Sequence, residues 1–253
     1  MSPALVVVHC VTLVAFVATA GSHAQSGQTV PSSPDEARQT ARTDENRAAR
    51  MRYHFALVMD VHDAVVRGDL EVAQKHARAL ADAPDPPGLP AAAGPYVFAM
   101  HRAAGRAASE DDLDEVGAAA AAMLAACGDC HRAVGTMPVI PGPGASAVGG
   151  KVGHMLEHKR AVDLMAQGLV APSTSTWRQG ATALQAAPLR GRDLPRDPKL
   201  TREIREFEER VHELAERGKA AADTRSRIYV YGEVIESCGA CHSLHANVWG
   251  PDR

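Results

Sequence analysis

The sequence predicts an all-α fold built as two tandem four-helix bundles. Three observations favour it. The chain is 45% apolar but only 4% aromatic, and much of the apolar content is alanine, which favours helix. Glycine and proline divide each half into four segments of helical length. Several landmarks also recur in the second half in the same order as in the first, as a duplicated module would produce.

The N-terminal segment is expected to be separate from the fold. Residues 1–24 are predicted to be a signal peptide, because the apolar run Leu5–Ala20 is followed by small-residue cleavage patterns at 18–20 and 22–24. No Lys or Arg precedes the run, so an uncleaved anchor stays open, although the run is short for a membrane span. We therefore expect an exported, periplasmic protein, with residues 25–42 as a polar, poorly ordered lead-in.

The first bundle is predicted to span residues 43–137. Its helices are expected over 43–67, 69–82 and 95–108, and from Asp112 through a cysteine motif. A break at Gly68 and the loop Pro84–Pro90 separate the first three. Pro95 is tolerated at a helix start, and residues 109–112 supply caps for the last helix.

The second bundle is predicted to span residues 151–253, after a Pro/Gly-rich linker at 138–150. Its helices are expected to begin at Lys151, Ser173, Pro198 and Ala222. The expected breaks are Gly168, Pro188–Pro195 and Gly218.

Paired histidines mark the repeat between the halves. His54 precedes Gly68 by fourteen residues (68 − 54), and His154 precedes Gly168 by the same number (168 − 154). The offset between the halves grows from 100 here to 111 at the cysteines, as small loop insertions would produce. Tandem duplication is the simplest account.

The four cysteines beyond the N-terminal segment form two copies of C-x-x-C-H. The copies run from Cys127 and Cys130 to His131, and from Cys238 and Cys241 to His242. This is the sequence that attaches haem c. Two thiols at this spacing reach the two vinyl groups of one porphyrin, and the histidine that follows becomes the proximal iron ligand. Two covalently attached haem c groups are therefore expected.

Three other interpretations of the cysteines fit less well. A redox-active C-x-x-C needs one copy, usually near a βαβ pattern, and no adjoining histidine. A zinc ribbon needs its two C-x-x-C pairs close together, whereas about a hundred residues separate these. Two disulfides would not explain why a histidine follows both pairs.

A four-helix unit with C-x-x-C-H near the end of its last helix resembles the cytochrome c-prime type of fold. The resemblance covers each half and rests on the position of the motif. The small cytochromes c differ, because their motif lies near the N-terminus and a methionine ligand follows, whereas no methionine follows His242. The c-prime family often leaves the sixth iron position vacant or fills it with a methionine of the first helix.

The sixth ligand decides between electron transfer and ligand binding. His54 and His154 are the preferred candidates, because the start of a first helix lies beside the end of an antiparallel last helix. At the helical rise, His54 and His131 lie at about 21 and 28 Å from one end of the bundle, whereas His101 falls roughly 18 Å short of His131. The other candidates are His101 with His212, Met51, Met59, Met155 and His158.

The leading hypothesis is therefore a periplasmic dihaem electron carrier with bis-histidine, low-spin irons and no enzymatic activity. Its expected partners are redox proteins that dock transiently. The net charge of −3 favours neither nucleic acid nor an acidic membrane surface. The alternatives are a gas-binding or sensor protein with an open haem, and a dihaem peroxidase-like enzyme, which the similarity of the halves disfavours.

Overall fold

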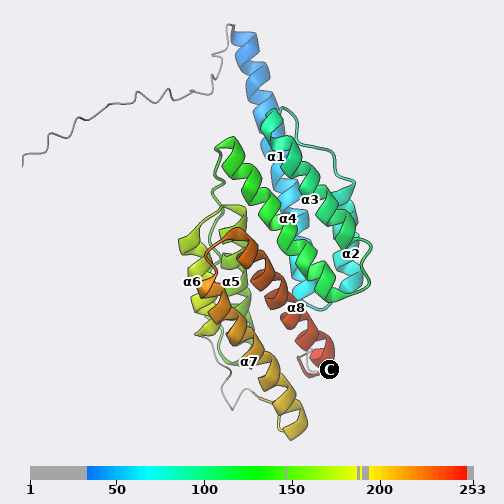
Figure 1. Ribbon diagram of the computed structural model, residues 1–253, viewed down its shortest axis with the longest axis vertical. Coiled ribbons are helices and arrows are strands. Elements are labelled where there is room, and N and C mark those ends of the chain that lie inside the picture. The colour runs from blue at the N-terminus through cyan, green and yellow to red at the C-terminus, as the bar shows by residue number, and fades with distance from the viewer. Residues whose placement is uncertain (1–32, 146, 187–188, 190–193, 250–253) are drawn as a thin grey trace, which may run out of the picture. The chain divides into compact units, whose positions relative to one another are not determined.

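The computed structural model describes residues 33–145, 147–186, 189 and 194–249. Within these ranges all regular structure is helical and no strand occurs, which confirms the all-α class (Figure 1). The chain divides into two units, residues 1–40 and residues 41–253, and the second contains both cysteine motifs. The predicted signal peptide, residues 1–24, lies outside the described ranges.

The first half contains four α-helices and one short 3₁₀ turn. They are α1 (Pro34–Val66), α2 (Leu70–Ala81), η1 (Ala91–Ala93), α3 (Gly94–Ala107) and α4 (Leu113–Val134). The last three α-helices begin and end within about two residues of their expected limits. The lead-in predicted over residues 25–42 needs correction, because residues 34–42 belong to α1. Pro34 at the helix start, followed by two acidic residues in the first turn, stabilises this extension.

Local signals account for the boundaries in this half. The side chains of Asp69 and Asp112 accept hydrogen bonds from Val72 N and Asp114 N and cap α2 and α4. Gly135 ends α4 in the left-handed conformation, with φ of 69°. Gly68 also has a positive φ, 73°, and ends α1 as expected.

The second half contains α5 (Gly150–Val170), α6 (Thr174–Gln185), α7 (Pro198–Ala220) and α8 (Thr224–Trp249). The predicted breaks at Gly168 and Gly218 are wrong, because both glycines lie inside helices. A β-carbon at Gly168 would lie 2.7 Å from the backbone nitrogen of Trp177, and one at Gly218 would lie 3.3 Å from Cβ of Ala181. These glycines let α5 and α7 pack closely on α6 and do not end their helices.

Helices of the two halves share one hydrophobic core. In the first half α3 packs against α2 and α4, and in the second α5 and α7 flank α6 while α8 contacts both α5 and α7. Between the halves, α4 packs against α5 and α8 (Figure 1). The α4–α8 pair is antiparallel, since Gly239 meets Leu113 at one end and Arg132 lies 3.4 Å from Thr224 at the other. The buried side chains form one cluster that includes members from both halves. None of the helices in the described part of the chain is both long and apolar enough to cross a lipid bilayer.

The carboxyl groups of Asp114 on α4 and Glu236 on α8 face each other across the contact between these helices. Their interaction makes the stability of the fold depend on pH. Burial and the neighbouring Asp114 raise the pKa of Glu236 to about 7, from 4.5 in an unfolded chain. Between these values the folded protein retains a proton that the unfolded chain releases. The stability associated with that proton is therefore present below pH 4.5 and lost as the pH rises through about 7.

Glu236→Gln keeps this side chain neutral at every pH. Because Glu236 is partly solvated, we expect the variant to be more stable than the parent by only about 1 kcal/mol at pH 8. Near pH 4.5 the two should unfold alike, and thermal unfolding at both pH values measures the difference. Glu233→Gln is the control, since Glu233 pairs with Arg217 at 2.7 Å and should gain nothing. An equal shift at both pH values would contradict the titration of Glu236.

Candidate functional site

The first cysteine motif lies in the last turns of α4 and borders a small cavity. Cys127, Cys130 and His131 line it together with His54 and Met51 from α1. The rest of the cavity wall includes Tyr96, Val97 and Met100 of α3 and Pro86 of the preceding loop. The cavity volume is about 30 Å³. The structure thus brings His54 to the same cavity as the motif, as the sequence predicts.

The second motif borders a much larger cavity, with a volume of about 320 Å³. Cys238, Cys241 and His242 of α8 line it together with His154 and His158 of α5. Most of the remaining wall is apolar and is formed by Met155, Leu156, Val162, Leu189, Ile204, Phe207 and Val211. Two cations, Arg67 and Lys159, and two carboxylates, Asp63 and Glu208, also reach this cavity.

All four motif cysteines are free thiols. Burial raises the pKa of Cys127 and of Cys238 to about 12 and that of Cys241 to about 11. It also raises the pKa of Cys130. In the folded chain the thiols are therefore protonated at neutral pH, and a protonated thiol is a poor nucleophile.

His54 is buried, and its Nε2 lies 3.1 Å from the carbonyl oxygen of Pro84. Burial lowers the pKa of His54, an effect that the bond to Pro84 only partly offsets. The ring is thus kept neutral, which is the form that binds a metal. Because a carbonyl only accepts, Nε2 donates to Pro84, and this bond must break before Nε2 can bind anything else.

Two of the alternative histidines, His101 and His212, lie outside the walls of these two cavities. Among the described residues, the linings of the two cavities include His54 and His154 but neither His101 nor His212. The ring of His101 lies 5.8 Å from that of His54, and its two nitrogens face Ala81 O at 3.1 Å and Asp85 at 3.2 Å.

At the second site two histidines of α5 lie one turn apart. The rings of His154 and His158 are 4.1 Å apart, and His212 lies 6.2 Å beyond His158. His154 therefore has a neighbour on its own helix that reaches the same cavity, whereas His54 has a methionine, Met51, in the comparable role.

Each motif histidine hydrogen-bonds to the end of a helix in the opposite half. Nδ1 of His131 lies 2.8 Å from the carbonyl oxygen of Val170, and Nδ1 of His242 lies 2.5 Å from that of Val66. Because carbonyl oxygens only accept, both rings carry their proton on Nδ1 and leave Nε2 with a free lone pair. A ring held in this tautomer is arranged to bind a metal through Nε2.

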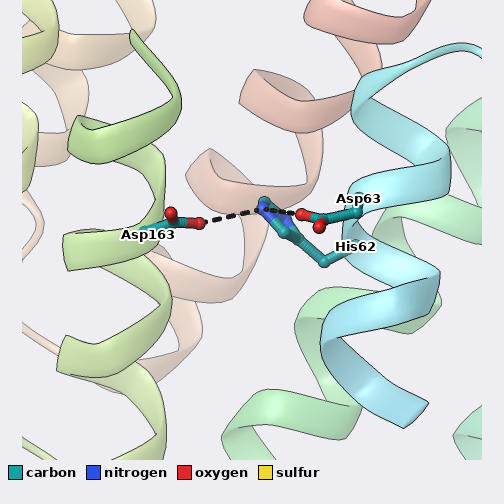
Figure 2. Close-up of side chains that lie close together, drawn as sticks. All are labelled: His62, Asp63 and Asp163. Carbon is teal, nitrogen blue, oxygen red and sulfur yellow. Dashed lines mark ion pairs between the residues drawn. The ribbon is translucent and has the colours of Figure 1, made fainter. Parts of the chain in front are cut away.

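A buried polar network between the halves was not foreseen (Figure 2). The fully buried His62 has Nε2 at 3.5 Å from Asp63 and 3.4 Å from Asp163, and Tyr231 Oη lies 2.8 Å from its Nδ1. Lys159 Nζ lies 3.1 and 2.6 Å from the two carboxylates. The repeat between the halves could have revealed the two carboxylates of this network. Asp63 follows His54 by nine residues (63 − 54), and Asp163 follows His154 by the same number (163 − 154).

Two members of this network, Asp163 and Lys159, favour each other's charged form. Burial raises the pKa of Asp163, but hydrogen bonds from His62 and Lys159 outweigh this and leave the pKa lowered. Burial lowers the pKa of Lys159, but the two carboxylates reverse this and leave the pKa raised. His62, Asp63 and Asp163 have the spacing of a metal-binding cluster, yet the ammonium group of Lys159 already supplies the cation between the carboxylates.

No protein family, curated protein or solved structure matches this chain.

Proposed function

We propose that this protein is a dihaem c-type cytochrome that transfers electrons through haems attached at Cys127/Cys130 and Cys238/Cys241. The principal support is a repeated arrangement. In each half, the C-x-x-C-H motif of the last helix lines a cavity together with a histidine of the first helix. Two tandem four-helix bundles, each similar to the cytochrome c-prime type, would explain why this arrangement occurs twice.

The residues present fit a haem most clearly at the second site. The cavity of about 320 Å³ lies within the range of roughly 300–1,000 Å³ that is usual for cofactor pockets. Its wall is mainly apolar, as a porphyrin requires, and two free thiols and three histidine rings reach it. Arg67 supplies positive charge beside it, which suits the carboxylates at the edge of a haem.

The first site has the same donors in a closed form. A cavity of about 30 Å³ cannot hold a porphyrin, so this site must open on attachment. The loop that contains Pro84 and Pro86 is the segment that would have to move, because Pro84 accepts from His54 and Pro86 lines the cavity. The raised pKa of about 12 keeps the Cys127 thiol in its less reactive, protonated form in the folded chain.

Each side chain would have a defined role. The four cysteines would hold the cofactors covalently, His131 and His242 would bind iron as the ligands within the motifs, and His54 and His154 would be the additional iron ligands. Haem iron, when bound, supplies a one-electron couple, and two histidine ligands without a methionine favour a rather low potential. Because both iron faces would be occupied by the protein, no substrate chemistry is required, and transiently docked redox proteins are the partners. Export, with residues 1–24 as the targeting segment, is part of the same proposal.

Mass spectrometry and visible spectra of the exported protein, made in a host that matures c-type cytochromes, test the proposal. We expect the mass of the chain plus two haems. We also expect a sharp α/β band pair on reduction that carbon monoxide does not change. A chain without haem would refute the cytochrome assignment. Two haems with a broad high-spin spectrum that shifts with carbon monoxide would refute electron transfer through saturated irons.

One observation favours a second function, ligand binding at the second haem. The second cavity is about ten times the volume of the first, and two cations and two carboxylates reach it. A haem there with an open position would make the protein a gas-binding or sensor protein. In the visible spectra of the reduced protein, carbon monoxide would then shift the bands of one haem, about half of the total absorbance.

A further inference from the structure

The helix ends that meet the two motifs belong to the opposite halves of the chain. Val170, whose carbonyl faces Nδ1 of His131, is the last residue of α5, and Val66, whose carbonyl faces His242, is the last residue of α1. The final carbonyls of a helix have no partner within it and carry its partial negative charge. They are therefore strong acceptors for an imidazole N–H.

Glycines within the motifs permit this contact. A β-carbon at Gly128 would lie 2.0 Å from the carbonyl oxygen of Leu169, and one at Gly239 would lie 2.2 Å from that of Val65. Both distances are far below van der Waals contact, and the opposing atoms are backbone. The first residue between the cysteines must consequently be glycine in both motifs if the opposing helix end is to approach.

The same two helices also contain the candidate sixth ligands. Helix α1 contains His54, which lines the first site. Twelve residues and about 18 Å further on, the same helix ends at Val66, which contacts His242 of the second site. Helix α5 contains His154, which lines the second site. Sixteen residues and about 24 Å further on, it ends at Val170, which contacts His131 of the first site. Each of these helices therefore contacts both sites.

We propose that each haem is held by both halves of the chain, with the end of α5 orienting His131, the end of α1 orienting His242, and Gly128 and Gly239 as the positioning residues that admit them. The inference rests on the proposed function. A hydrogen bond to Nδ1 makes the imidazole a more basic iron ligand. A more basic ligand favours ferric over ferrous iron, so each contact lowers the potential of the haem in the other half.

Nuclear magnetic resonance of the reduced holoprotein tests the contact directly, because low-spin ferrous haem is diamagnetic. We expect slowly exchanging ring N–H signals for His131 and His242. The first should show cross-peaks to Val170 and Ala171, and the second to Val66 and Arg67. Fast exchange with solvent, or cross-peaks only to residues of the same half, would overturn the inference while leaving the haem content, and thus the proposed function, intact.

Variants test its consequence. Gly128→Ala should raise the midpoint potential of the first haem more than that of the second, and Gly239→Ala should do the reverse. Gly105→Ala, where nothing lies within 4 Å of the added carbon, is the control. Potentials of both glycine variants equal to those of the control would overturn the inference. If a glycine variant fails to fold, the wild-type resonance measurement still decides.

Discussion

If the chain carries the two proposed haems, replacing His54 with alanine should change the first of them from a saturated, low-spin form to one that binds carbon monoxide. His54 is the buried first-helix histidine that shares a cavity with Cys127, Cys130 and His131. Without its ring the sixth iron position loses its protein ligand. One of the two haems, and therefore about half of the spectrum, should change.

Absorption spectra of the ferric and reduced variant, with and without carbon monoxide, measure this effect. His101→Ala is the matched control, since His101 lies 5.8 Å from His54 but outside the cavity wall, held by Ala81 O and Asp85. It should leave both haems saturated. If the first haem of His54→Ala remains low-spin and ignores carbon monoxide, another residue is its ligand, and Met51 would be tested next.

The second haem requires a double variant. His158 lies one turn beyond His154 and lines the same cavity, so either ring has access to the iron position. We expect His154→Ala with His158→Ala to open the second haem completely, whereas His154→Ala by itself should leave part of it low-spin. His212→Ala is the control and should change nothing. A low-spin second haem in the double variant would exclude both histidines.

Truncating Trp177 should produce the largest loss of stability in the second half. Trp177 is fully buried, and its backbone lies against Gly168 of α5. Its indole Nε1 donates to Gly218 O of α7 at 2.7 Å, and the guanidinium of Arg227 on α8 lies 5.7 Å from its ring. One side chain thus connects three neighbouring helices. Trp177→Ala should cost about 3–5 kcal/mol, a large share of the 5–15 kcal/mol typical of a folded protein.

Denaturant unfolding followed by circular dichroism measures this cost. Trp177→Phe is the companion variant, because it retains most of the volume and loses the hydrogen bond to Gly218. It should cost only about 1–3 kcal/mol, for the lost hydrogen bond and the smaller ring, because Gly218 O still accepts from Ala221 N. Equal losses in the two variants would mean that the hydrogen bond, and not the filled volume, accounts for the stability. A loss under about 1 kcal/mol in Trp177→Ala would show that the helices pack without it.

The sequence by itself determined the helices and the candidate ligands. The caps Asp69, Asp112, Ser173 and Asp197 act on backbone N–H groups no more than three residues away, so they are recognisable without knowledge of the fold. The spacing within C-x-x-C-H is equally local. The placement of His54 beside His131 followed from one further assumption, that the first and last helices of a bundle are antiparallel.

Only the tertiary structure decided how the halves contact each other. Gly168 was expected to end its helix as Gly68 does, yet it lies inside α5 because Trp177 packs against it. The acceptors of His131 and His242 lie 39 and 176 residues away in the chain. The same holds for the network around His62 and for the difference between the two cavities. Contacts of this kind depend on side-chain packing between distant segments, and no local spacing or propensity encodes them.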